Sequence, residues 1–138
     1  MNGKKKVRLM AETILRDSEN STFMRHAGYG ELETEGEHFT LSYTQNQDGE
    51  QIQIHLSGTK KGIQMERKGE ASGVLVFEPG KTIKSLYHLS FGEIEMQIQT
   101  ERITCQLDDK DGFIELVYES GMVGEEMNKA TYRCKWKR

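Results

Sequence analysis

Hydrophobic and polar residues alternate along most of the chain. Phe39, Leu41 and Tyr43 are separated by Thr40 and Ser42, and the same alternation runs through residues 52–56, 94–98 and 130–136. Successive side chains of a β-strand point to opposite faces, so each segment predicts a strand with one buried and one wet face. No stretch carries a helical stripe longer than two turns. We therefore predict an all-β protein.

Short turn signals divide the alternating segments. Pairs such as Asp48-Gly49, Pro79-Gly80 and Asp111-Gly112 recur at roughly the spacing expected of a β-sandwich or barrel. They predict ten strands, at about residues 5–16, 21–34, 37–45, 50–57, 61–67, 71–77, 82–90, 92–108, 113–120 and 127–137.

The strand predicted at residues 92–108 contains an irregularity. Its apolar residues occupy even positions up to Ile98 and odd positions from Ile103 onwards, and no turn residue lies between them. A change of parity without a turn is typical of a β-bulge. We predict one long, bent strand with a bulge between Thr100 and Arg102.

Short connections make strands that are adjacent in sequence adjacent in space. An even number of such strands can close with the first strand antiparallel to the last, which removes exposed sheet edges. We predict a closed, up-and-down antiparallel β-barrel of about ten strands, with an open two-sheet sandwich as the alternative. Residues 1–138 form one domain, in which residues 1–4 are expected to be disordered.

The composition is that of a soluble globular protein, with 35% hydrophobic and 30% charged residues in a chain of 138. No segment approaches the roughly 20 apolar residues of a membrane helix. The basic residues near the N-terminus precede no apolar export region. The two cysteines, Cys105 and Cys134, are expected to be free thiols within the core. We expect a cytoplasmic protein.

One region carries a family resemblance. It contains Leu107-Asp108-Asp109-Lys110-Asp111-Gly112, the alternating Ile114, Leu116 and Tyr118, then Val123-Gly124, and before them Tyr87-His88-Leu89-Ser90-Phe91-Gly92-Glu93-Ile94-Glu95. These stretches resemble the YwiB-like family of uncharacterised bacterial proteins, most clearly over residues 82–132. The resemblance implies a lipocalin-like (calycin) β-barrel and a bacterial cytoplasmic protein. It supplies no catalytic residues.

Motifs of catalysis or of metal binding are missing from the sequence. There is no nucleophile elbow and no phosphate-binding glycine loop. The histidines, His26, His38, His55 and His88, lie on four different predicted strands without metal-ligand spacing. We predict no catalytic residue, no metal site and no cofactor, and hence a protein that is not an enzyme.

Four tyrosines and one arginine lie at interior positions of their predicted strands. These are Tyr43, Tyr87, Tyr118, Tyr132 and Arg67. A buried tyrosine hydroxyl needs a hydrogen-bond partner, which could be another side chain, water or a ligand. The leading hypothesis is non-enzymatic binding of a small, partly apolar molecule in the barrel, with Arg67 holding its head group in a charge-assisted pair.

The rival hypothesis is a barrel that flattens until Trp136, Phe77 and Phe39 meet across its middle. Such a protein would act through its surface, as a module that binds protein or nucleic acid. The packed interior would then satisfy the tyrosine hydroxyls internally.

Basic residues gather at the two ends of the chain. They are Lys4, Lys5, Lys6, Arg8, Lys135, Lys137 and Arg138. Without these seven, 12 basic residues face 22 acidic ones in a chain whose formal net charge is −3. If the first and last strands pair, the seven charges meet at one end of the barrel. They predict a weak binding patch for an anionic partner.

Overall fold

A computed structural model describes residues 3–17, 19–108 and 110–138. Ten strands account for nearly all of it, and no helix occurs in these ranges. The strands are β1 (Lys5–Arg16), β2 (Ser21–Glu35), β3 (His38–Gln47), β4 (Glu50–Thr59), β5 (Gly62–Lys68), β6 (Ser72–Phe77), β7 (Thr82–Leu89), β8 (Gly92–Leu107), β9 (Asp111–Met122) and β10 (Asn128–Lys137). Each predicted boundary falls within two residues of the observed one. The predicted disorder of residues 1–4 falls partly on Met1 and Asn2, which lie outside the described residues.

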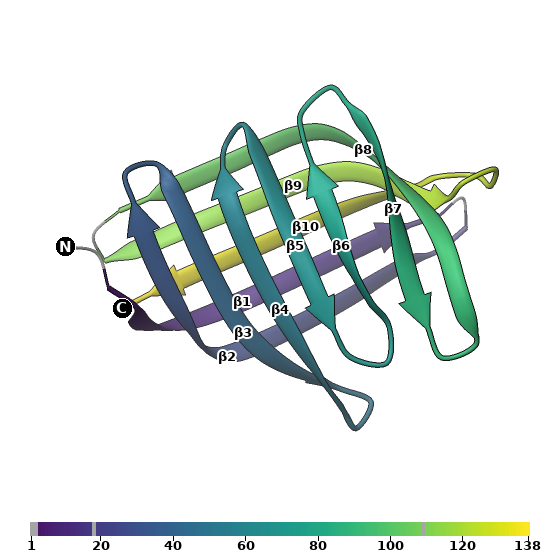
Figure 1. Cartoon of the computed structure of the whole chain (residues 1–138). Coiled ribbons are helices and arrows are strands. Elements are labelled where there is room, and N and C mark those ends of the chain that lie inside the picture. The colour runs from purple at the N-terminus through teal and green to yellow at the C-terminus, as the bar shows by residue number, and fades with distance from the viewer. Residues whose placement is uncertain (1–2, 18, 109) are drawn as a thin grey trace.

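The strands close into a barrel in sequence order, and β1 pairs with β10. Every ladder is antiparallel, as the short connections predict. Figure 1 shows β3 to β7 running steeply across the long strands β1, β9 and β10. No helix in the described part of the chain is long and apolar enough to cross a membrane.

The predicted bulge in β8 is confirmed. Thr100 pairs with Tyr118 and Arg102 pairs with Val117, so Glu101 is the extra residue. The bulge bends β8, so its first half pairs with β7 and its second half continues along β9.

Aromatic side chains meet across the middle of the barrel. The ring centroids of Phe39 and Trp136 lie 6.3 Å apart, and those of Phe77 and Tyr118 lie 4.8 Å apart in an edge-to-face arrangement. All four residues are buried. Each such pair stabilises the fold by about 0.5–1.5 kcal/mol beyond the burial of its area. The centre is therefore packed. The predicted contact of Phe39 with Trp136 is present, whereas the ring paired with Phe77 is that of Tyr118.

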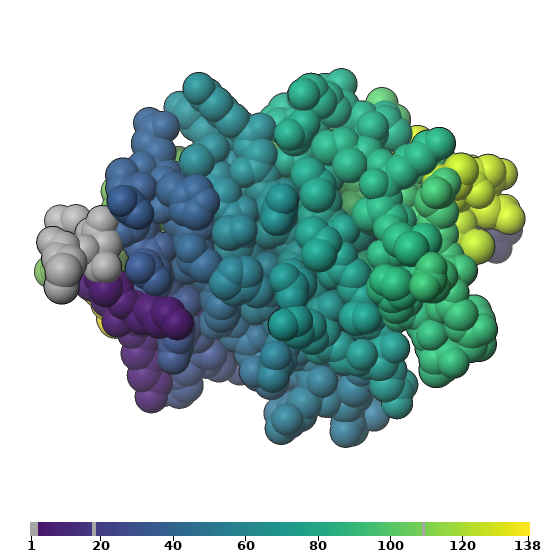
Figure 2. Space-filling view, in the orientation of Figure 1, coloured from purple at the N-terminus to yellow at the C-terminus, as the bar shows by residue number. Residues whose placement is uncertain are grey.

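The barrel wall is weakest between β6 and β7. Only two residue pairs join these strands, Ser72 with His88 and Gly73 with Tyr87. The turn between them is tied instead to β8, since Gly80 N–H donates to the Thr100 carbonyl at 2.9 Å and Thr100 N–H donates to the Lys81 carbonyl at 3.2 Å. The first half of β7 therefore follows β8 and separates from β6. Figure 2 shows the face of the molecule on which β3 to β7 lie.

Candidate functional site

Two of the predicted interior tyrosines are joined by a hydrogen bond between their hydroxyl groups. The hydroxyl oxygens of Tyr43 and Tyr132 lie 2.7 Å apart, and both side chains are buried. Burial raises the pKa of both hydroxyl groups, because the phenolate would lose its hydration. His26 stacks on Tyr43 with ring centroids 5.6 Å apart. This pair forms a neutral, hydrogen-bonded part of the core.

The other two tyrosines have different surroundings. Tyr118 packs against Phe77, and burial raises its pKa to about 12. Tyr87 is half-buried; burial raises its pKa, and the positive charge of Arg67 partly offsets this rise. Of the four tyrosines, Tyr43 and Tyr87 are therefore the two whose pKa is lowered by the positive charge of Arg67, against the larger rise caused by burial.

Arg67 and Tyr87 belong to one row of residues across the barrel wall. Arg67 pairs with Gly73, and Gly73 pairs with Tyr87. A methyl group on Gly73 would lie 2.5 Å from the Tyr87 ring, so the ring rests directly on the glycine backbone. Glycine at this position thus lets the Tyr87 ring pack against the backbone of β6.

Two buried polar atoms near this row have no hydrogen-bond partner among the described residues. They are Arg67 Nε and Ser85 Oγ. Ser85 faces Met96 on β8, and it lies just beyond the last pair that joins β7 to β6. An unpartnered buried donor of a charged group is costly, by about 1–3 kcal/mol or more. These atoms therefore mark a place where a polar ligand group would be stabilised.

A hollow of about 460 Å³ opens over the same seam. Arg67, Gly73 and Ser85 line it from the inside. Val74 and Leu86, which are 38% and 46% exposed, line it from the outside. We call this hollow, with its Arg67 and Ser85 side chains, the seam site. It combines Arg67, a hydroxyl and an apolar wall, and its rim also carries Ser72, His88 and the ion pair of Glu66 with Lys68.

The basic chain ends come together as the barrel closes. Arg8 on β1 pairs with Lys137 on β10, and Met10 pairs with Lys135. The Arg138 N–H donates to the Lys110 carbonyl at 2.8 Å and fixes the end of β10. The predicted meeting of the termini at one end of the barrel is thus a feature of the strand register.

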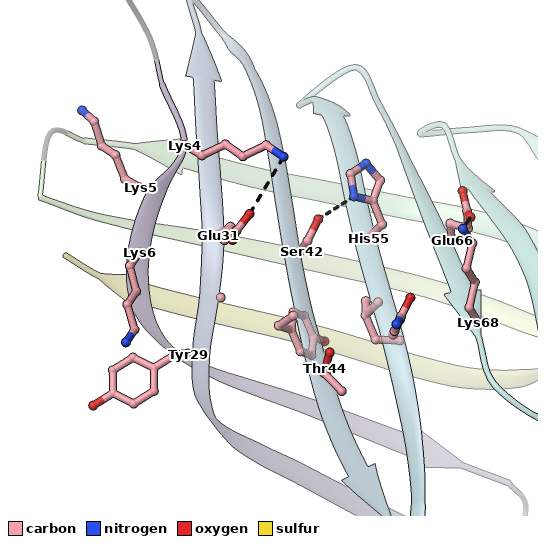
Figure 3. A pocket seen from close by; sticks show the side chains of 14 residues that line it. Lys4, Lys5, Lys6, Tyr29, Glu31, Ser42, Thr44, His55, Glu66 and Lys68 are labelled. Carbon is pink, nitrogen blue, oxygen red and sulfur yellow. Dashed lines mark hydrogen bonds and ion pairs between the residues drawn. The ribbon is translucent and has the colours of Figure 1, made fainter.

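Lys4, Lys5 and Lys6 border a groove on the outer wall, with a volume of about 870 Å³ (Figure 3). Its floor carries Ser42 and His55, whose side chains are joined by a hydrogen bond of 2.6 Å. The groove forms where β2 separates from β3, because no residue of β2 before Gly30 pairs with that strand. We call it the outer groove.

Ion pairs occur on both sides of the outer groove. Lys4 approaches Glu31 at 4.0 Å, and Lys68 approaches Glu66 at 3.1 Å (Figure 3). Of the residues that line the outer groove, the three N-terminal lysines were predicted from the sequence as part of a binding patch. The side chains that β3, β4 and β5 contribute to the groove were not predicted. The alternation of residue types does place Ser42, His55 and Glu66 at outward positions. Only the pairing register of the strands shows that they are neighbours in one row.

Comparisons with known proteins place the chain in a family. A family model described as a domain of unknown function, DUF1934, matches residues 9–133. The YwiB-like resemblance is confirmed by the uncharacterised β-barrel protein YwiB of Bacillus subtilis (strain 168). That protein is 23% identical over 120 residues, which cover 87% of this chain and 84% of YwiB.

The fold is shared with a crystal structure of the ywiB protein from Bacillus subtilis. The TM-score is 0.86 at 20% identity, over 97% of this chain and 92% of that one. This likeness concerns the fold alone. All seven residues of the predicted basic patch lie outside residues 9–133, whereas the seam site lies within them.

Proposed function

The chain belongs to the DUF1934 family of domains of unknown function, and for this member we propose non-enzymatic binding of a small, partly apolar molecule that carries a carboxylate or another anionic head. The seam site receives it. The observation that carries the proposal is the buried, unpartnered Arg67 Nε, which has no acceptor among the described residues and lies beside the weakest part of the barrel wall.

Each group of the seam site has a role in the proposed binding. Arg67 forms a charge-assisted hydrogen bond with the head of the ligand. Ser85 Oγ orients this head. The exposed apolar side chains of Val74 and Leu86 cover the ligand body, with about 25 cal/mol gained per Å² of apolar surface removed from water.

The packed centre limits the ligand to the wall of the barrel. Tyr43 and Tyr132 already bond to each other, and Tyr118 packs on Phe77. In this proposal, these three tyrosines belong to the packed core. Tyr87 lies beside the hollow, where its ring packs on Gly73. The ligand is thus held at the seam and does not fill the barrel.

The proposed setting is the cytoplasm. Cys105 and Cys134 are both free thiols. Ile114 on β9 pairs with Cys105 on β8 and with Cys134 on β10, so the two cysteines lie on opposite sides of β9. Two strand spacings amount to about 9.6 Å, more than a disulfide spans. Such cysteines are compatible with a reducing compartment.

Calorimetric titration with decanoate and with decanol tests the proposal. The two probes share an apolar body and differ in the charge of the head. We expect decanoate to bind the wild-type protein at least about ten-fold more tightly than decanol. Arg67→Met should abolish this preference, because methionine fills the space without the charge.

Arg102→Met provides the matched control. Arg102 lies on the outer wall of β8, where it approaches Glu115 at 3.4 Å and has no part in the seam site. This variant should retain the preference for decanoate. Binding of neither probe, or equal binding of both by the wild-type protein, would refute the proposed function.

A further inference from the structure

The outer face formed by β2, β1, β10 and β9 carries a surface unrelated to the seam site. Two neighbouring rows of outward residues cross these four strands. One row contains Tyr29, Arg8, Lys137 and Asp111, and the next contains Ala27, Met10, Lys135 and Phe113. We call these two rows, together with Lys6 beside Tyr29, the terminal platform.

The cations of the terminal platform have no carboxylate within ion-pair distance among the described residues. This holds for Lys6, Arg8, Lys135 and Lys137. The next row of the same sheet face behaves differently. There Arg25 pairs with Glu12 at 3.1 Å, and Arg133 pairs with Glu115 at 2.6 Å.

Aromatic rings flank the unpaired cations on the two outer strands of the platform, β2 and β9. Tyr29 is 59% exposed, and Lys6 Nζ lies 4.5 Å from its ring centroid. Phe113 is partly exposed, and Lys135 Nζ lies 5.9 Å from its centroid. The strands that carry the two rings lie three strand spacings apart, about 14 Å, and the rings stand in neighbouring rows, with the exposed Met10 between those strands.

The platform is positive on a protein that is negative overall. Its four cations outnumber Asp111 and the adjacent Glu31, whereas the whole chain has a formal net charge of −3. A local surplus of this kind attracts a polyanion to one face and repels it from the rest. The outer groove continues from Tyr29 and Lys6, and its rims carry the ion pairs of Lys4 with Glu31 and of Lys68 with Glu66.

We propose that the terminal platform binds single-stranded nucleic acid. Unpaired lysine and arginine side chains contact the phosphates, while bases stack on Tyr29 and Phe113. A duplex hides its bases from these rings, and an acidic peptide offers no bases to stack. Cations flanked by an exposed tyrosine and a partly exposed phenylalanine on a sheet face fit a strand whose bases are free.

Fluorescence anisotropy with a labelled single-stranded RNA of about ten nucleotides tests the proposal at several salt concentrations. The double variant Arg8→Gln/Lys137→Gln should weaken binding at least about five-fold and reduce the slope of log affinity against log salt by about 1.4. Tyr29→Ala should weaken binding about five-fold or more without changing this slope, because it removes stacking and no charge.

The same ladder offers a matched control. Arg16 and Lys129 also pair across β1 and β10, at the other end of the sheet and on the same outward face. Arg16→Gln/Lys129→Gln removes the same two charges and should change the affinity less than about two-fold. Circular dichroism of each variant should retain the β-sheet spectrum of the wild-type protein.

Three results would overturn the nucleic-acid assignment. The first is the absence of binding at low salt. The second is an equal loss of affinity in the two double variants, which would mean diffuse charge attraction. The third is that heparin or duplex RNA binds as tightly as the single-stranded RNA and that Tyr29→Ala leaves the affinity for the single strand unchanged. None of these assays involves the Arg67 side chain, so they fail or succeed independently of the seam site.

Discussion

The hydroxyl groups of Tyr43 and Tyr132 form a hydrogen bond of 2.7 Å across the inside of the barrel, although 89 residues separate them in sequence. Their strands, β3 and β10, are not neighbours in the wall, because β1 and β2 lie between them. The bond therefore joins separate parts of the wall through the core. The bond occupies the hydroxyl groups of Tyr43 and Tyr132 in the core. Tyr87, in contrast, lies at the seam, beside Arg67 and Gly73.

Replacing either tyrosine of this pair alone should lower the free energy of unfolding by more than half of the loss caused by replacing both. Tyr43→Phe or Tyr132→Phe leaves a buried hydroxyl without its partner, and we expect each to lower the free energy of unfolding by about 1–3 kcal/mol. The double variant should be less destabilised than the sum of the two. Urea denaturation of the four proteins measures this coupling. Additive losses would mean that the bond contributes nothing of its own.

Alkaline pH should destabilise the protein. Burial raises the pKa of the hydroxyl groups of Tyr43, Tyr87, Tyr118 and Tyr132, that of Tyr118 to about 12. In the unfolded chain these groups ionise near pH 10, so their contribution is complete below about pH 10 and is lost as the pH rises towards about 12. Phenolate absorbance, followed with circular dichroism, should show late ionisation coincident with unfolding. Ionisation of every tyrosine near pH 10 in the folded state would contradict the buried arrangement.

Gly112→Ala should be strongly destabilising. A methyl group at this position would overlap the Trp136 ring, which is itself buried. We expect a loss of about 1–3 kcal/mol, as for other overpacked cores. Adding Trp136→Phe should recover part of it, because a smaller ring leaves room for the methyl group. Thermal unfolding of both proteins measures the difference, and a wild-type melting temperature for Gly112→Ala would show that the contact is not tight.

The two thiols should react at different rates. Burial raises the pKa of the Cys134 thiol to about 12 and also raises the pKa of the Cys105 thiol, which is only half-buried. Only the thiolate attacks a disulfide reagent. With a chromogenic disulfide, Cys105 should react first, and Cys134 only at the rate at which the barrel opens. After denaturation both should react at once. Two equally fast native thiols would place Cys134 outside the core.

Much of the fold follows from the order of residues alone. Alternation predicts the strands, and the change of parity after Ile98 predicts the bulge, because both depend on neighbours in sequence. Short connections then predict the closed order of the strands. Parity also places Arg67 among interior positions, and its Nε atom is indeed buried.

The features that define the candidate sites depend on distant residues. The seam between β6 and β7 arises because the Gly80 N–H bonds to the Thr100 carbonyl, on another strand of the wall. Alternation cannot tell that Arg67 Nε lacks a partner among the described residues, or that Tyr43 has one in Tyr132. The packed centre likewise depends on contacts between strands that are distant in sequence, such as that of Phe39 on β3 with Trp136 on β10.

The most direct test of binding at the seam site is the nuclear magnetic resonance signal of the Arg67 Nε–H group during a titration with decanoate. This proton is buried and has no acceptor among the described residues. We predict that its signal moves downfield with decanoate, together with the amide signals of Gly73, Ser85 and Tyr87, and that it does not move with decanol. An Arg67 signal that stays in place while decanoate shifts residues elsewhere, or shifts none, would contradict binding at the seam site.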